Sequence, residues 1–375
     1  MRQETSKALF ARLFVAIDAP DGGVPARTTE LDLERYRSTE ELAREEAVLF
    51  RRRPIVVAHA SSLKSHGDFV TDEIAGTPLL VLRDGERIRV LLNACRHRGA
   101  RLTSEPCGKA KLLTCPYHAW SYRLDGSLMR VPHEEVFGGG LDKQALGLLE
   151  LPSEVRHGFV WACLHPSAGL DVAAFLGPTL EDDWASFGLD RYVMLGERVH
   201  RPRANWKLIV DAFAEGYHLA SLHSGSLARF FLETAILDDC APHVRQVGAR
   251  KSLREASARE TPDLRRDTTV FYDVFPNTVL VFHPNWLTAL TMIPEGVDRA
   301  RVVHRMLAPV GTDATELEKS FTHIDAQVFA KEDLAIAESI QSTLASGALR
   351  TMTLGGMEEG MRLFHAARDA ALRQG

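Results

Sequence analysis

The chain has 375 residues, 45% of them hydrophobic and 25% charged, and a formal net charge of −5. This composition is typical of a globular protein, and its mildly acidic balance gives no support for binding nucleic acid or an acidic membrane. The 5 cysteines are too few, and odd in number, for a disulfide scaffold. Residues 1–22 lack the uninterrupted apolar core of a secretory signal, and no run approaches the roughly 18 apolar residues of a membrane span, so we expect a cytoplasmic protein with reduced thiols.

Short strands separated by turns are predicted in the first half of the chain. The apolar runs that read as strands occupy six segments, namely residues 54–60, 77–84, 86–95, 111–117, 121–128 and 158–164. Asp-Gly pairs at 84–85 and 125–126 are typical of hairpin turns. We therefore predict a small antiparallel β domain, with a boundary near the segment HPSAGL at residues 165–170.

Helices and strands are mixed in the second half. Helices are predicted for residues 205–223, 316–344 and 357–372. Two strands joined at a Pro-Asn turn are predicted within 278–294, and a further strand at 301–307. Strands followed by segregated helices indicate an α+β domain, and the length allows two or three domains in all.

A mixed pattern of metal ligands stands in the predicted β domain. Cys95 and His97 form a C-x-H pair, and Cys115 and His118 form a C-x-x-H pair further along. Zinc fingers keep like ligands together, whereas here each half supplies one thiolate and one imidazole. This suits a cluster in which both thiolates bind one iron and both imidazoles the other, as in a Rieske [2Fe–2S] centre. A structural zinc protein, which would lack the visible absorbance of such a cluster, is the alternative.

The sequence around these ligands resembles the Rieske domains of ring-hydroxylating oxygenases. The resemblance is carried by CRHRGARL at residues 95–102 and by CPYHAWSYRLDGSL at residues 115–128. One departure is Ala119, where that family usually has glycine.

A second group of ligands lies in the segment NWKLIVDAFAEGYHLASLH at residues 205–223. Glu215 and His218 would share a face of an ideal helix, but five residues turn about 140° further, so His223 can join His218 on one ion only if the helix loosens or ends. The segment resembles the N-W-K…Y-H-x₄-H motif of Rieske non-haem iron oxygenase α subunits. The matching residues are Asn205, Trp206, Lys207, Tyr217, His218 and His223, with Asp211 at the acidic position midway.

The resemblance, which covers the chain from about residue 45 onward, implies a mononuclear Fe(II) held by two histidines and a carboxylate. His218 and His223 are the expected histidine ligands, and Asp333 the expected carboxylate. Its neighbour Glu332 is the alternative, because adjacent helix positions point about 100° apart and only one can reach the metal. Glu215, where the family usually has aspartate, and Asp211 are the expected catalytic carboxylates.

The resemblance also implies the architecture. We expect an N-terminal segment, residues 1–45, that packs on the catalytic domain; a Rieske [2Fe–2S] domain, residues 46–160; and a catalytic mononuclear iron domain, residues 161–375. The expected fold class is α+β, with an all-β Rieske domain beside a helix-grip, START-like domain in which helices flank an antiparallel sheet. A homotrimer is expected, with each active site shared between subunits.

The expected function is that of a terminal oxygenase. It would take electrons, originally from NAD(P)H, from a separate ferredoxin or flavin reductase and use O₂ to hydroxylate, dihydroxylate or demethylate an aromatic or apolar substrate, as in aromatic hydrocarbon catabolism. The alternative is a non-catalytic Rieske electron carrier. Five residues are expected to line the substrate pocket: Phe230, Phe231, Leu280, Phe282 and Leu290. The basic segment 241–268 is expected to be a mobile loop, a lid or a patch for an acidic ferredoxin.

Overall fold

The computed structural model of the chain divides into two compact units. The small unit contains residues 50–175, and the large unit joins residues 1–49 to residues 176–375. The structure describes residues 1–19, 22–138, 140–256 and 262–374. Within these residues, no helix is both long enough and apolar enough to cross a membrane.

Three antiparallel sheets form the small unit, with strand orders β10-β11-β2, β5-β4-β3-β6 and β7-β8-β9. The strands are β2 (Ile55–His59), β3 (Asp68–Ile74), β4 (Thr77–Asp84), β5 (Arg87–Leu92), β6 (Cys107–Lys109), β7 (Leu113–Thr114), β8 (Ser121–Tyr122), β9 (Leu128–Arg130), β10 (Ser153–Arg156) and β11 (Phe159–Ala162). The predicted all-β domain is therefore confirmed. Strands β3, β6 and β10 were not predicted, because polar residues interrupt their apolar pattern.

The core of the small unit lies directly beneath the predicted cluster ligands. Leu80, Leu91 and Tyr122 are fully buried there, and the same apolar cluster contains Cys95 and Cys115. A close-packed core of this kind holds the two ligand-bearing loops on a rigid support.

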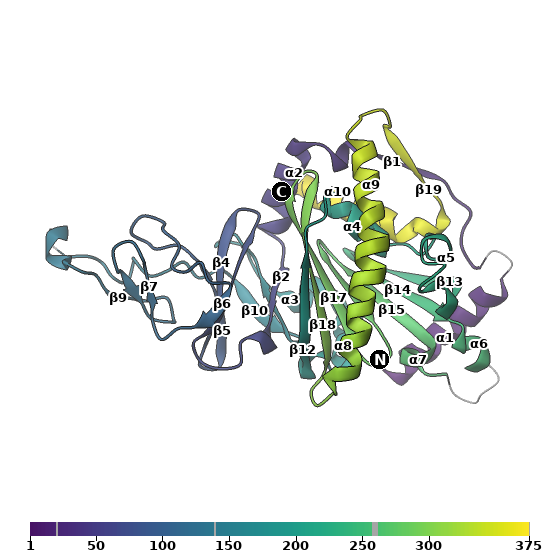
Figure 1. The fold of residues 1–375 in the computed structure, drawn as a ribbon, viewed down its shortest axis with the longest axis horizontal. Coiled ribbons are helices and arrows are strands. Elements are labelled where there is room, and N and C mark those ends of the chain that lie inside the picture. Colours follow the sequence, from purple (N-terminus) through teal and green to yellow (C-terminus); the bar gives the residue numbers. More distant parts are fainter. Residues whose placement is uncertain (20–21, 139, 257–261, 375) are drawn as a thin grey trace. The chain divides into compact units, whose positions relative to one another are not determined.

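A seven-stranded antiparallel sheet forms the centre of the large unit, with the order β12-β18-β17-β16-β15-β14-β13 (Figure 1). Its strands are β12 (Tyr192–His200), β13 (Phe231–Cys240), β14 (His243–Arg250), β15 (Thr268–Val274), β16 (Thr278–Phe282), β17 (Leu287–Gly296) and β18 (Arg299–Pro309). A two-stranded sheet pairs β1 (Thr29–Asp32) with β19 (Thr351–Leu354).

Helices accompany this sheet. One continuous helical stretch runs through α8 (Ala314–His323), the π-helical η7 (Ile324–Leu334) and α9 (Ala335–Leu344), and it crosses one face of the sheet (Figure 1). The other α-helices of the described part of this unit are α1 (Gln3–Asp18), α2 (Thr39–Glu45), α4 (Trp206–Phe213), α5 (Leu219–Leu222), α6 (Ser252–Ala256), α7 (Leu264–Asp267) and α10 (Glu359–Gln374), with α3 (Val172–Phe187) at the unit boundary. An antiparallel sheet accompanied by helices agrees with the predicted α+β fold class of this domain.

Two predicted elements were wrong in detail. Residues 205–223 do not form one helix: α4 ends at Phe213, and α5 begins at Leu219. The chain thus leaves the helix before His218, not between the two histidines. Segment 241–268 is not a single mobile loop, because residues 243–250 form strand β14 inside the large sheet. Residues 257–261 of that segment lie outside the described residues.

The Asn-Trp-Lys motif anchors α4. Asn205 caps the helix by accepting a hydrogen bond from the Lys207 backbone N–H at 3.0 Å. The Glu45 carboxylate accepts hydrogen bonds from Trp206 Nε1 at 3.0 Å and from Lys207 Nζ at 2.9 Å, and it also pairs with Arg368. Lys207 and Glu45 are both fully buried, so each charge depends on the other for compensation.

Candidate metal centres and substrate cavity

Two loops of the small unit bring like ligand atoms together. The Nδ1 atoms of His97 and His118 lie 3.1 Å apart, and Cys95 and Cys115 belong to one buried cluster, where burial, with a contribution from Cys115, raises the pKa of Cys95. Both cysteines are buried and free of disulfide bonds. The sequence prediction paired two thiols and two imidazoles, and the loops arrange them in that way.

This donor set fits a [2Fe–2S] cluster. Bonds of about 2.1 Å from one tetrahedral metal to two imidazoles would place the two nitrogens roughly 3.4 Å apart, close to the separation of His97 and His118. Burial raises the pKa of the Cys95 thiol, which therefore keeps its proton until a metal replaces it. The Tyr122 hydroxyl lies 3.3 Å from Cys95 Sγ and accepts a hydrogen bond from the Arg96 N–H at 3.0 Å.

The two ligand loops share one turn geometry. The residue four positions after each cysteine, Gly99 or Ala119, donates its N–H to the carbonyl of that cysteine, at 2.9 Å and 3.0 Å respectively. Both residues have a left-handed backbone, with φ of 78° for Gly99 and 57° for Ala119. Glycine adopts this conformation freely and alanine does not, so the glycine that the family resemblance leads one to expect at position 119 would fit this turn with less strain.

In the large unit, His218, His223 and Asp333 converge, and their ligand atoms all lie within 4.8 Å of one another. The Asp333 carboxylate lies 3.1 Å from His223 Nε2 and 3.8 Å from His218 Nε2. His218 and His223 flank the short helix α5, while Asp333 comes from η7. His218 and His223 occupy the N-cap and C-cap positions of this four-residue helix, and both direct Nε2 towards the Asp333 carboxylate.

The opposite nitrogens of these imidazoles are held by two other carboxylates. Glu215 contacts His218 Nδ1, and Glu332 lies 2.6 Å from His223 Nδ1 while also accepting a hydrogen bond from Ser226 Oγ at 2.7 Å. Glu332, the alternative ligand, thus lies on the Nδ1 side of His223, away from the point where the two Nε2 atoms meet. Two imidazole nitrogens and one carboxylate directed at one point, with two further carboxylates behind the imidazoles, form a donor set that suits a divalent iron, so the residues fit the expected metal.

Asp211 has different partners. It is buried and accepts a hydrogen bond from the Tyr36 hydroxyl at 2.6 Å, and it lies 3.0 Å from His365 Nε2. The sequence analysis placed Asp211 with Glu215 as a catalytic carboxylate; the contacts of Asp211 are with Tyr36 and His365, and its catalytic role stays a prediction.

A cavity of about 900 Å³ opens beside the three candidate iron ligands. Its walls come from β13 to β18, from η7 and from α1. The aromatic lining residues are Phe213, Phe230, Phe231, Phe271, Trp286 and Phe329. Polar lining groups include Arg250, Thr288 and His304 on the sheet and His283 in the connection between β16 and β17. A mainly apolar cavity with a few polar groups is typical of a small-molecule site.

Three of the five predicted pocket residues, Phe230, Phe231 and Leu290, line this cavity. Leu280 and Phe282 were wrong: they are buried on the other face of β16, and Val281 lines the cavity between them. Successive side chains of a strand point to opposite faces, so the prediction had the wrong phase for this strand.

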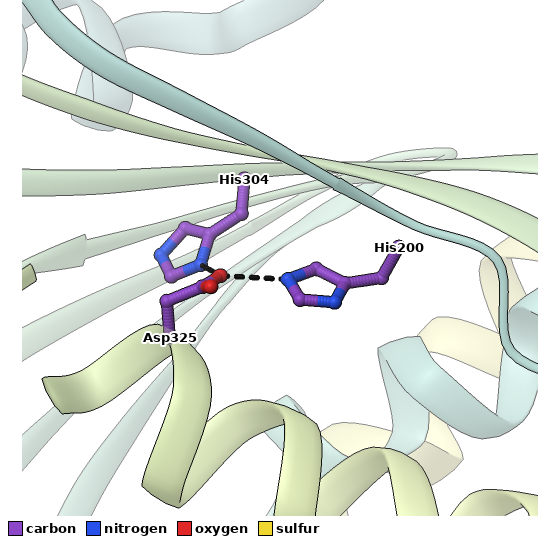
Figure 2. Close-up of side chains that lie close together, drawn as sticks. All are labelled: His200, His304 and Asp325. Carbon is purple, nitrogen blue, oxygen red and sulfur yellow. Dashed lines mark hydrogen bonds and ion pairs between the residues drawn. The ribbon is translucent and has the colours of Figure 1, made fainter. Parts of the chain in front are cut away.

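A second group of two histidines and a carboxylate was missed from the sequence. Asp325 Oδ1 lies 2.7 Å from His200 Nε2 and 2.8 Å from His304 Nδ1 (Figure 2). His200, His304 and Asp325 come from β12, β18 and η7, and no spacing in the sequence links them. The two short hydrogen bonds to one oxygen fix the ring of His304 in the cavity wall, where its Nε2 lies 3.4 Å from Thr288 Oγ1.

Comparison with known families supports the assignment of both units. The Rieske [2Fe-2S] domain family matches residues 53–144, and the ring hydroxylating alpha subunit (catalytic domain) family matches residues 189–374. The carnitine monooxygenase oxygenase subunit of Acinetobacter baumannii is 28% identical over 331 residues, covering 84% of this chain and 85% of that protein. The anthranilate 1,2-dioxygenase large subunit of Acinetobacter baylyi is 33% identical over 182 residues, covering 47% of this chain and 38% of that protein.

Solved structures agree in fold. The quaternary ammonium Rieske monooxygenase CntA, in complex with an inhibitor, aligns with a TM-score of 0.80 and 25% identity over 93% of this chain and 95% of that one. Naphthalene 1,2-dioxygenase from Rhodococcus sp., bound to indole, aligns with a TM-score of 0.78 and 20% identity over 99% of each chain. The chain carries a Rieske [2Fe–2S] cluster and mononuclear non-haem iron and uses O₂. It belongs to the α subunits of the Rieske non-haem iron oxygenases.

Proposed function

We propose that His218, His223 and Asp333 hold the mononuclear iron, that Cys95, His97, Cys115 and His118 hold the cluster, and that the enzyme oxygenates an organic molecule with an aromatic or apolar body. The observation that carries this proposal is the convergence of two Nε2 atoms and the Asp333 carboxylate at the wall of a largely aromatic cavity. When bound, such an iron supplies O₂ activation.

The protein's own residues position the reactants. Glu215 and Glu332 fix the two imidazoles through their Nδ1 atoms, which keeps both Nε2 atoms directed at one point. The aromatic walls exclude water and hold a substrate body beside that point. Whether the product is a monohydroxylated, dihydroxylated or demethylated compound depends on which substrate carbon lies nearest.

Electrons come from a separate protein in this proposal. The sequence contains neither a GxGxxG fingerprint nor the C-x₄-C-x₂-C run of a plant-type ferredoxin. A ferredoxin or a flavin reductase that oxidises NAD(P)H is therefore the expected donor to the cluster. A cytoplasmic location is part of the proposal, because the cluster thiols must stay reduced until metal binds.

We infer a homotrimer with shared active sites. In the family that this chain belongs to, the cluster of one subunit serves the iron of the next, and a solved relative is described in terms of inter-subunit electron transfer. The proposed route runs from His118 of one subunit through Glu215 to His218 of its neighbour. Glu215 is the proposed link in this route because its carboxylate contacts His218 Nδ1 and because it lies two residues after the end of α4.

Metal counting tests the proposed function directly. Three irons per chain, two of them in the cluster, together with product formation driven by a surrogate reductase, are the expected result. Two irons per chain and no turnover would instead support the non-catalytic carrier. A substrate screen should pair aromatic compounds with quaternary ammonium compounds, since the relatives named above act on both kinds.

Subunit mixing tests the shared site. Cys115→Ser, without a cluster, and His218→Ala, without mononuclear iron, should each be inactive. Mixed trimers should recover partial activity, because an intact cluster then faces an intact iron across an interface. Absence of recovery in correctly folded mixed trimers would contradict the inter-subunit route.

A further inference from the structure

Arg250 places a cation in the wall of the cavity. It is the last residue of β14, and strand alternation puts it on the same face as Gln246 and Gly248, which also line the cavity. Its guanidinium lies over the rings of Phe231 and Phe230, at 5.3 Å and 5.8 Å from their centroids. The aromatic faces hold the guanidinium in place and leave its edge free for hydrogen bonding.

Most of the hydrogen-bonding capacity of Arg250 is unused. A guanidinium has five N–H donors. Among residues 1–19, 22–138, 140–256 and 262–374, the one hydrogen bond it makes is from Nη1 to Thr269 Oγ1, at 3.2 Å, and no carboxylate lies within ion-pair distance of it. The charge of Asp267 acts on the pKa of Arg250. The Asp267 carboxylate itself accepts a hydrogen bond from Arg266 Nη2 at 2.6 Å.

Two other arginines near the cavity already have anionic or carbonyl partners. Arg12 also lines the cavity, but it is 2.6 Å from the Asp238 carboxylate and 3.1 Å from the Leu237 carbonyl. Arg265 donates to the carbonyls of His283 and Trp286, at 2.8 Å and 2.9 Å. Arg250 is therefore set apart by its lack of an anionic or carbonyl partner within the described chain.

Burial without an anionic partner has an electrostatic cost. Burial lowers the pKa of Arg250 below the ordinary value of an arginine. Arg245 on the same strand is buried too, yet the carboxylates of Asp183 and Asp238 raise its pKa. A half-buried cation without an anion is costly to the free protein, and an incoming anion would remove that cost.

We propose that Arg250 binds a carboxylate of the substrate, so that the enzyme acts on organic acids with an apolar or aromatic body. The planar guanidinium matches a carboxylate with two parallel hydrogen bonds. Thr269 holds one side of the group, and the Phe230 and Phe231 faces prevent it from turning away. This inference rests on the proposed function, because it assigns the cavity beside the iron to the substrate.

Binding of a matched pair of probes, without turnover, tests the proposal. Benzoate and benzamide have the same shape, and only benzoate carries the negative charge. Calorimetric titration of the oxidised holoenzyme should give benzoate at least about a tenfold tighter dissociation constant than benzamide, as expected for a charge-assisted bidentate contact. Arg250→Met should reduce this preference to near one, and Arg250→Lys should keep part of it.

Two matched controls isolate the unpaired charge. Arg229→Met removes a cation that lies 4.8 Å from the Phe230 centroid but is exposed. Arg12→Met removes a cation that lines the cavity but is already paired. Both should keep the preference for benzoate. Equal affinity of the unmodified enzyme for the two probes, including no measurable binding of either, or an undiminished preference in Arg250→Met, would overturn the proposal.

Thermal unfolding adds an independent readout. Without ligand, Arg250→Met should be as stable as the unmodified protein or more so, because an uncompensated cation has been removed. Benzoate should then raise the unfolding midpoint of the unmodified protein and not that of the variant. A marked loss of stability in ligand-free Arg250→Met, together with no benzoate-dependent shift in the unmodified protein, would show that the guanidinium is already paired, and would overturn the proposal. Iron content and turnover are measured separately, so failure of the oxygenase function leaves these binding results readable.

Discussion

Replacing Glu332 and Asp333 one at a time should show which of them binds the iron and which only orients His223. The two residues are adjacent, yet Asp333 lies on the Nε2 side of both histidines and Glu332 lies 2.6 Å from His223 Nδ1. Asp333→Asn removes the anionic ligand and should abolish stoichiometric mononuclear iron. Glu332→Gln leaves all three ligands and weakens one charge-assisted hydrogen bond to a neutral one.

The expected size of the Glu332→Gln effect follows from that bond. Exchanging a charged for a neutral acceptor costs about 1 kcal/mol, or roughly fivefold in affinity. Loss of imidazole orientation adds to this, and changes in such supporting hydrogen bonds typically weaken metal binding by about 10- to 100-fold. We therefore expect a roughly tenfold weaker iron site in Glu332→Gln that still fills at high Fe(II).

The assay is anaerobic Fe(II) titration against a competing chelator, with the visible absorbance of the cluster as the reference for protein that is folded and loaded. Glu316→Gln is the matched control, since Glu316 lies in the same helical stretch, is exposed and pairs with Lys319 alone among the described residues. If Glu332→Gln loses iron completely while Asp333→Asn keeps it, the assignment of the third ligand is wrong by one residue.

Three further predictions concern the cluster and the buried network. Cys115→Ser should bleach the brown colour and remove the Rieske-type EPR signal of the reduced protein; an unchanged spectrum would exclude Cys115 as a ligand. Ala119→Gly should raise the free energy of unfolding by about 0.5–1 kcal/mol, measured by denaturant titration of the cluster absorbance, because glycine relieves the left-handed backbone; a decrease would contradict this reason. Glu45→Gln should lower the free energy of unfolding by about 3–5 kcal/mol, because Lys207 and Arg368 lose their shared buried carboxylate; a loss below about 1 kcal/mol would show that the charges are compensated elsewhere.

The cluster ligands were predictable from the sequence because they lie in two short loops. Each loop supplies its ligands within four residues, so local turn geometry is sufficient to bring a cysteine and a histidine to one place. Tight hairpins and apolar runs likewise identified most of the strands around them. What the sequence could not show is that Ala119 adopts the left-handed turn of Gly99, because a side chain gives no local sign that it tolerates that backbone.

The cavity was harder to predict, since its walls come from strands far apart in the chain. Strand β14 has Arg245 and Gln246 among its central residues, and such polar positions hid it from the apolar pattern. The phase of β16 could not be read either, because all five of its residues are buried and neither face appears polar. A strand buried on both faces leaves no alternation to follow.

The three carboxylates of the iron site show how position assigns different tasks to the same functional group. Glu215 and Glu332 each face an Nδ1 atom, one on His218 and one on His223, whereas Asp333 alone faces both Nε2 atoms. Because each imidazole is hydrogen-bonded on its outer nitrogen, both are fixed in the tautomer that leaves the inner nitrogen free to bind a metal. Glu215 lies in the connection between α4 and α5, and Glu332 and Asp333 lie in η7. The site therefore forms where this connection contacts η7. The proposed electron route uses the same arrangement, since Glu215, the carboxylate that orients His218, is the group through which that route would enter the iron site.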